Sequence, residues 1–217
     1  MYKKKSFFIV FEGVEGCGKS FQCKKLRKNL KKKGINSILT REPGGTKSSE
    51  LIRKLILKDY FSKSKKNEEK FDKYTDTLLY LAARNEHIKN KIKPALLKKE
   101  VVICDRFTDS TLAYQVYGKK VKMNFINQIH KTILQNVKPN LTFILKVTKK
   151  ISKLRLKKRK TKNRYDNFSQ SFYSKAQKSF IKIGRNKKNY YILNSSSNNN
   201  LLEKEIFKIV CKKLNIK

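Results

Sequence analysis

Residues 7–20 read Phe7-Phe-Ile-Val-Phe-Glu-Gly-Val-Glu-Gly-Cys-Gly-Lys-Ser20, an apolar run that leads into a glycine-rich turn. The run at residues 7–11 is typical of a strand that is buried on both faces of a parallel sheet. From Gly13 to Ser20 the turn fits the spacing G-x-x-x-x-G-K-[ST] in full, and the residues after it are compatible with a helix. In such a turn, backbone N–H groups and the positive end of the helix dipole surround phosphate oxygens. The stretch therefore predicts a phosphate-binding loop.

This motif assigns a chemical role to several side chains. We expect Lys19 to reach the β and γ phosphates of ATP, and the Ser20 hydroxyl to ligate Mg²⁺. Asp105 follows the apolar run 101–104 and stands where a carboxylate for Mg²⁺ belongs in such enzymes. An ordinary glycine turn is the alternative interpretation, and the strand before the motif and the helix after it disfavour that alternative. The predicted phosphate-binding residues are Gly13, Val14, Glu15, Gly16, Cys17, Gly18, Lys19 and Ser20.

The rest of the chain extends the pattern of strand and helix. Short apolar segments lie at residues 7–11, 37–40, 101–104, 141–147 and 190–193, with helix-compatible stretches between them. Strands that alternate with helices predict a parallel sheet with helices on both faces. We therefore predict an α/β fold, the three-layer P-loop NTPase fold, with a five-stranded parallel sheet in one domain over residues 1–217. Residues 62–73 are expected to form an exposed loop or a frayed helix end, and residues 195–200 a polar turn.

Composition narrows the classes of function. The formal net charge is +39, but the cations are 46 lysines scattered along the chain and only nine arginines. A dedicated nucleic-acid surface favours clustered arginine with stacking aromatics, whereas AT-rich codons produce scattered lysine, so we expect no specific nucleic-acid partner. No apolar run is long enough to span a bilayer, which argues against a membrane protein. The four cysteines form no C-x-x-C pair, as expected for reduced thiols in a cytoplasmic protein.

Five separated motifs resemble those of thymidylate kinase in its bacterial form, and together they cover nearly the whole chain. The motifs are Phe11-Glu-Gly-Val-Glu-Gly-Cys-Gly-Lys-Ser20, Thr40-Arg-Glu-Pro-Gly-Gly-Thr46, Leu78-Leu-Tyr-Leu-Ala-Ala-Arg84 with His87, Asp105-Arg-Phe-Thr-Asp-Ser-Thr-Leu-Ala-Tyr-Gln115, and Asn163-Arg-Tyr-Asp166 followed by Phe172. The resemblance implies Mg²⁺-assisted transfer of a phosphoryl group from ATP to dTMP, giving dTDP for dTTP biosynthesis. It also implies a homodimer, and a basic lid at about residues 149–166.

The resemblance further implies how dTMP is bound. Tyr80 would stack on thymine, and Arg84, Thr111 and Gln115 would hydrogen-bond the edge of the base. Tyr114 would lie near the sugar and Glu15 near its 3′-hydroxyl. The acceptor phosphate would be held by Arg53 and Arg106, with Arg41 within reach. The residues with implied catalytic roles are Lys19, Arg106, Arg159 and Arg164, with Arg155 as a further candidate in the lid.

Two other functions fit parts of the pattern. A deoxynucleoside kinase of the same fold would need a carboxylate base for a neutral hydroxyl acceptor, and Glu42 could supply it. A basic P-loop ATPase that acts on nucleic acid would explain the charge, and it predicts ATPase activity that DNA or RNA stimulates. Gly44-Gly45-Thr46 and the pair of Arg53 and Arg106 favour an anionic acceptor instead. A retained arginine in a lysine-rich chain indicates a need for a planar, two-pronged donor.

Overall fold

The computed structural model describes residues 5–57, 71–159, 169–197 and 199–216. Its strands form a five-stranded sheet in the order β2-β3-β1-β4-β5, and every pair of neighbouring strands is parallel. The strands are β1 (Phe7–Glu12), β2 (Ser37–Arg41), β3 (Val101–Asp105), β4 (Leu141–Lys146) and β5 (Tyr190–Asn194). Each of them coincides with a predicted apolar segment to within one residue at either end. The predicted five-stranded parallel sheet is confirmed.

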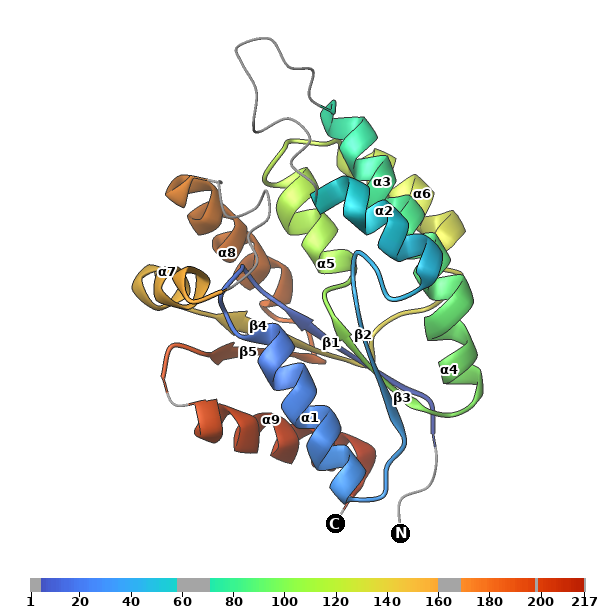
Figure 1. Cartoon of the computed structure of the whole chain (residues 1–217), viewed down its shortest axis with the longest axis vertical. Helices are drawn as coiled ribbons and strands as arrows, with labels where there is room; N and C mark the ends of the chain where they lie inside the picture. Colours follow the sequence, from blue (N-terminus) through green and yellow to red (C-terminus); the bar gives the residue numbers. More distant parts are fainter. Residues whose placement is uncertain (1–4, 58–70, 160–168, 198, 217) are drawn as a thin grey trace.

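Helical segments connect the strands and cover the sheet (Figure 1). They are α1 (Lys19–Lys32), α2 (Lys47–Leu57), α3 (Lys73–His87), η1 (Ile88–Ile92), α4 (Lys93–Leu97), α5 (Thr108–Thr111), η2 (Leu112–Val116), α6 (Met123–Ile133), α7 (Lys149–Lys157), α8 (Gln170–Gly184) and α9 (Asn199–Leu214). The segments η1 and η2 are single π-helical turns, and each continues an α-helix without a break. The sequence pattern did not predict them.

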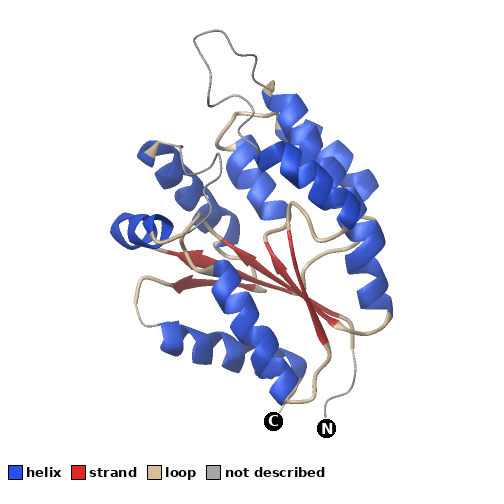
Figure 2. Ribbon diagram, viewed as in Figure 1, coloured by secondary structure: helices blue, strands red, loops and turns tan. Residues whose placement is uncertain are grey.

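The side chains of β1 alternate between the two faces of the sheet and build a core on each. Ile9 and Phe11 belong to the same buried cluster as Leu26 of α1, whereas Phe8 packs in a second cluster with Ile92 of η1. Helices α1 and α9 lie together on one side of the sheet, and α4 and α8 lie on the other (Figures 1 and 2). These helices and the sheet between them are the three layers expected of the P-loop NTPase fold.

Three predicted segments compare with the structure as follows. Most of the predicted exposed loop at residues 62–73 lies outside the described residues, and α3 begins at Lys73. The predicted polar turn at residues 195–200 is shorter than expected, because α9 begins at Asn199. In the predicted lid, residues 149–157 form α7, and residues 160–168 lie outside the described residues. Across the helices that the structure describes, none is long and apolar enough to cross a membrane.

Candidate nucleotide-binding site

The glycine-rich turn directly follows β1 and leads into α1. Gly13, Gly16 and Gly18 have positive φ angles of 133°, 72° and 90°. At Gly16 a side chain is also excluded by space, because an added Cβ would lie 2.8 Å from the Ser152 carbonyl oxygen. Since α1 begins at Lys19, its free N–H groups face the turn. This backbone arrangement suits phosphate oxygens.

Not every residue of the turn presents its side chain to the site. Val14 and Cys17 are 4% and 0% exposed and belong to the hydrophobic core, so any phosphate contact from them uses backbone N–H groups. Lys19 is also buried, and its Nζ donates to the carbonyl oxygens of Gly13 at 3.0 Å and Val14 at 2.9 Å. The ammonium group is thereby held inside the turn, as the predicted contact with phosphate requires.

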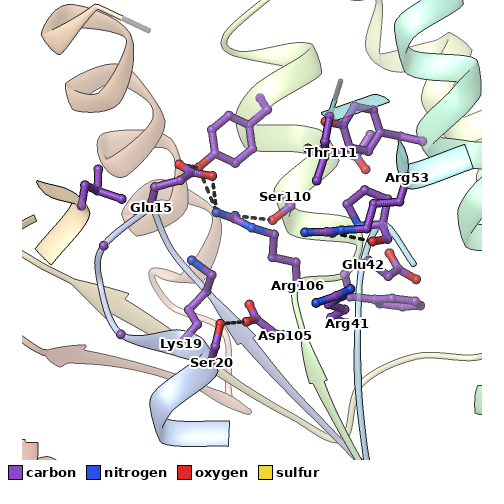
Figure 3. Close-up of a pocket in the computed structure, with 18 of the residues that line it drawn as sticks. Glu15, Lys19, Ser20, Arg41, Glu42, Arg53, Asp105, Arg106, Ser110 and Thr111 are labelled. Atoms are coloured by element: carbon purple, nitrogen blue, oxygen red, sulfur yellow. Dashed lines mark hydrogen bonds and ion pairs between the residues drawn. The ribbon is translucent and has the colours of Figure 1, made fainter. Parts of the chain in front are cut away.

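Ser20 and Asp105 meet at the ends of α1 and β3, as the predicted Mg²⁺ site requires. The Ser20 hydroxyl donates to Oδ2 of Asp105 (Figure 3). Mg²⁺ is usually held by one or two protein oxygens together with water and substrate phosphates. No group of three His, Cys, Asp or Glu side chains within residues 5–57, 71–159, 169–197 and 199–216 is arranged to hold a metal. A hydroxyl and a carboxylate beside a phosphate-binding loop therefore fit Mg²⁺ that arrives with ATP.

Arg106 is at the centre of a buried polar network beside the glycine turn (Figure 3). Its guanidinium donates to Glu15 Oε1 at 2.6 Å, to the Gly13 carbonyl at 2.9 Å and to the Ser110 hydroxyl at 3.0 Å. The Tyr114 hydroxyl donates to the other oxygen of Glu15 at 2.7 Å. Burial disfavours a charged Glu15, but Arg106 and Lys19 outweigh burial and lower the pKa of this carboxyl. The Glu15 carboxylate and the Arg106 guanidinium thus lie side by side at the carboxyl ends of β1 and β3.

Arg41 and Arg53 face Arg106 from the opposite wall (Figure 3). Arg53 of α2 donates to the Pro43 carbonyl at 2.6 Å, and Arg41, at the end of β2, donates to both oxygens of Glu50 at 3.2 and 3.0 Å. Burial and the neighbouring Arg41 lower the pKa of Arg53. Two guanidinium groups that repel each other beside a cavity favour an anionic ligand between them.

Together these walls enclose a cavity of about 480 Å³, here called the central cavity. This volume is in the range of small-molecule sites. The predicted site residues that line it are Glu15, Gly16, Gly18, Lys19, Ser20, Arg41, Arg53, Tyr80, Arg84, Asp105, Arg106, Thr111, Tyr114, Gln115 and Arg159. The fold therefore brings together side chains that the sequence separates by more than a hundred residues.

Gln115 lines the central cavity with a buried amide group that has an unused donor. Gln115 is 2% exposed, and its Nε2 has no hydrogen-bond partner among the described residues. A buried amide donor without a partner costs about 1–3 kcal/mol, so this N–H₂ group favours a ligand that offers an acceptor. Tyr80 and Thr111 line the same cavity, and Tyr114 and Gln115 belong to the π-helical turn η2. Such turns are frequent at functional sites.

Comparison with known proteins identifies the family. The family model described as thymidylate kinase matches residues 11–206. The chain is 42% identical to the thymidylate kinase of Vesicomyosocius okutanii over 81% of this chain and 82% of that protein. It is 38% identical to that of Wolbachia pipientis from Culex pipiens, over 95% and 96% of the two chains. The crystal structure of thymidylate kinase from Ehrlichia chaffeensis superposes with a TM-score of 0.74 at 31% identity and covers 95% of this chain and 99% of that one.

The chain belongs to the thymidylate kinase family. The family resemblance of the five motifs is thereby confirmed, and so is a phosphotransferase that uses ATP. The comparisons do not test the roles of single residues, so each role stays a prediction.

Among the arginines expected in the thymidylate kinase lid, Arg155 contacts the glycine turn. It donates to the Gly16 carbonyl at 3.3 Å and to the Ser195 carbonyl at 2.8 Å, and the Ser152 hydroxyl donates to the Glu15 carbonyl at 2.8 Å. Helix α7, the first part of the predicted lid, is thus held against the glycine turn by hydrogen bonds. Arg159 lines the central cavity, and Arg164 lies outside the described residues.

Arg84 is more heavily engaged than a residue that only reads the base. It donates to Glu42 at 2.8 Å, to Thr111 at 2.8 Å and to the Phe107 carbonyl at 3.0 Å, and it pairs with Nε2 of His130 at 2.8 Å. Since a guanidinium has five N–H donors, one remains for a ligand. Direct recognition of thymine by Arg84 stays a prediction, with that one donor to serve it.

Three polar residues of the thymidylate kinase site were not predicted. Glu12 and Ser110 lie buried beneath Arg106, and His130 of α6 accepts a hydrogen bond from Arg84. Glu12 stands next to the glycine motif, so its place at the end of a buried strand was a usable signal. His130 carried no signal, because α6 belongs to none of the five motifs and a lone histidine on a helix is ordinarily structural.

His130 makes the free energy of unfolding depend on pH. Burial and the nearby Arg84 lower the pKa of His130 from 6.5 to about 3. In the unfolded chain this histidine binds a proton below pH 6.5, whereas the folded chain keeps it neutral down to about pH 3. The contribution of His130 to the free energy of unfolding is therefore fully present above pH 6.5, and it falls by up to about 1.4 kcal/mol for each pH unit below that.

The variant His130→Gln keeps an acceptor for Arg84 but does not titrate. We expect its free energy of unfolding to fall by about 2 kcal/mol less than that of the wild type between pH 6.5 and 5. Urea unfolding of both proteins across that range measures it, and parallel stability curves would contradict the assignment.

Proposed function

We propose that the central cavity holds ATP and dTMP end to end, and that the chain moves the γ-phosphoryl group of ATP onto dTMP to form dTDP. The convergence of Lys19, Arg41, Arg53 and Arg106 on one cavity beside the glycine turn supports this most strongly. Two phosphorylated ligands that meet head to head need cations from both sides, and both walls of this cavity supply them.

Alignment and charge neutralisation supply the catalysis in this proposal. A monophosphate acceptor is already ionised near neutral pH, so its phosphate oxygen attacks without a general base. Arg53 and Arg106 hold the acceptor phosphate, and Lys19 and Arg106 neutralise charge on the moving phosphoryl group. Ser20 and Asp105 would hold Mg²⁺, which when bound neutralises charge on the β and γ phosphates. Glu15, held by Arg106 and Tyr114, would accept a hydrogen bond from the 3′-hydroxyl of the sugar.

The surroundings of Glu42 disfavour the deoxynucleoside kinase alternative. One oxygen of this buried carboxylate accepts from Arg84 at 2.8 Å, and the other pairs with Nδ1 of His87 at 3.0 Å. Burial opposes its charge, but Arg84 and His87 outweigh burial and lower the pKa of Glu42. A carboxylate whose pKa is lowered and whose oxygens are both occupied is a poor base for a neutral hydroxyl.

A panel of acceptors tests the function. Purified protein with ATP and Mg²⁺ is offered dTMP, dUMP, the other deoxynucleoside monophosphates and thymidine, and ADP formation is recorded. We expect dTMP to give the highest kcat/KM. Preference for thymidine would establish the deoxynucleoside kinase alternative, and ATP hydrolysis that needs only DNA or RNA would establish the nucleic-acid ATPase.

We further propose that a lid arginine stabilises the transition state. Arg159 lines the central cavity, as Lys19 does, and Arg164 stands at the family's lid motif. Loss of a transition-state arginine costs about 10³-fold or more in rate in this chemistry. We expect such a fall in kcat for Arg159→Ala or Arg164→Ala, with exposed Arg185→Ala of the α8 end as the control. If both lid variants retain the kcat of the control, the lid arginines are not part of the catalytic step.

We also propose a cytoplasmic homodimer. All four cysteines are free thiols, as expected in a reducing compartment. Leu51 of α2 and Leu78 of α3 are 65% and 47% exposed on two helices that pack together, and exposed leucines on neighbouring helices favour burial against a second copy. Light scattering should give about twice the chain mass of 25.5 kDa. A monomer at micromolar concentration would contradict the dimer.

A further inference from the structure

Glu12 is a fully buried carboxylate that no role described above uses. It is the last residue of β1 and is 0% exposed. One of its oxygens accepts from the backbone N–H groups of Phe107 at 2.8 Å and Ser110 at 3.2 Å, and the other accepts from the Ser110 hydroxyl at 2.6 Å. All three donors belong to the segment that follows β3, about a hundred residues away in sequence.

These contacts cap helix α5 from a distant strand. Phe107 is the N-cap residue of α5, and its side chain has no group that can accept from the free N–H groups of the first turn. Glu12 accepts from the N–H of the N-cap residue itself and from that of Ser110 in the first turn. Because α5 continues directly into η2, the cap fixes the start of the helical segment that carries Thr111, Tyr114 and Gln115.

The same carboxylate reaches Arg106 through one intermediate hydroxyl. Ser110 Oγ donates to Glu12 and accepts from Nη1 of Arg106 at 3.0 Å. Arg106 has a φ of 75°, a left-handed conformation that costs a non-glycine residue about 1 kcal/mol or more. The backbone N–H of Arg106 donates to the Phe11 carbonyl at 2.9 Å. Phe11 and Glu12, the last two residues of β1, therefore both hold the turn that follows β3.

We propose that Glu12, acting through Ser110, is a positioning residue. It fixes Arg106 and the η2 segment in the relative positions that bind the acceptor nucleotide. This inference rests on the proposed function, because it assigns Arg106 to the acceptor phosphate and η2 to its base and sugar. Burying a carboxylate is costly: burial and the nearby Asp109 raise the pKa of Glu12, whereas Arg106 and the hydrogen bonds from Ser110 and Phe107 oppose that rise. A purely apolar residue would avoid that cost, so the carboxylate is explained by the three donors that it orders.

Substitutions at Ser110 test the link without removing the buried acid. Ser110→Ala keeps the backbone cap but breaks the connection from Glu12 to Arg106, whereas Ser110→Thr retains a hydroxyl. We expect Ser110→Ala to raise KM for dTMP about tenfold, the loss of one hydrogen bond to a charged group, with KM for ATP changed less than twofold. Ser110→Thr should stay within about threefold of the wild type. Glu12→Gln, which presents an amide to the hydroxyl, should raise KM for dTMP at least as much as Ser110→Ala.

Ser179→Ala is the matched control. Ser179 is 9% exposed, as Ser110 is, and its hydroxyl donates within its own helix to the Lys175 carbonyl. The inference is overturned if Ser110→Ala and Glu12→Gln lower the melting temperature but leave KM for dTMP unchanged, or if KM rises equally for ATP and dTMP. Its failure is distinct from failure of the proposed function, since in the latter case the wild-type protein itself would not phosphorylate dTMP.

Discussion

Lys19→Met is expected to lower kcat by about 10²- to 10³-fold while the protein keeps its fold. The methionine fills nearly the same volume but carries no charge, so the phosphoryl group loses one preorganised cation inside the turn. Two carbonyl oxygens already hold the ammonium in place, so its position costs nothing to organise when ATP arrives. We expect the substitution to lower kcat, because the charge on the oxygens of the transferred phosphoryl group changes most in the transition state.

The measurement is a steady-state assay at saturating ATP and dTMP, with the melting temperature taken in parallel. Lys28→Met is the control, because Lys28 is an exposed lysine of the same helix and lies outside the central cavity. The control should keep kcat within about twofold. A Lys19→Met protein that retained more than a third of the wild-type kcat would exclude Lys19 from the catalytic step.

The fold and the phosphate loop were predictable because their determinants are local. The glycine spacing from Gly13 to Gly18 encodes three positive φ angles within six residues, and the apolar run before it encodes a strand buried on both faces. Family motifs predicted that Tyr80, Arg84, Arg106 and Gln115 share one site, and all four line the central cavity. Each of those positions carries a residue type whose chemistry suits a nucleotide.

The supporting contacts were not predictable because they join positions far apart in the chain. Arg84 pairs with His130, 46 residues away, and Glu12 contacts Ser110, 98 residues away. Glu12 and Arg84 stand in or beside motifs, but a single sequence gives no sign of which buried polar groups meet in the fold. The partners of Glu42 illustrate the consequence: from sequence it was available as a base, whereas the structure shows both of its oxygens occupied.

Arg84→Met is expected to destabilise the folded protein by about 3–5 kcal/mol, because it removes the main partner of a buried carboxylate. The side chains of Arg84 and Glu42 are 3% and 4% exposed, so water does not replace the missing guanidinium. The stabilisation from Glu42 is present above its ordinary pKa of 4.5 and is lost as pH falls through its lowered pKa in the folded protein. At pH 7 the full cost of the stranded charge should therefore appear in urea unfolding.

A double-mutant cycle separates a stranded charge from simple loss of packing. Glu42→Gln removes the charge with little change of volume, so Glu42→Gln combined with Arg84→Met should be less destabilised than the sum of the two single variants by at least about 1 kcal/mol. Additive losses would show that the pair does not interact and that Arg84 stabilises the fold by packing alone. The activity of the double variant tests the other predicted role of Arg84, recognition of the base. If the remaining donor of Arg84 binds thymine in the wild-type protein, kcat/KM for dTMP stays low in the double variant, although that variant is more stable than additive losses predict.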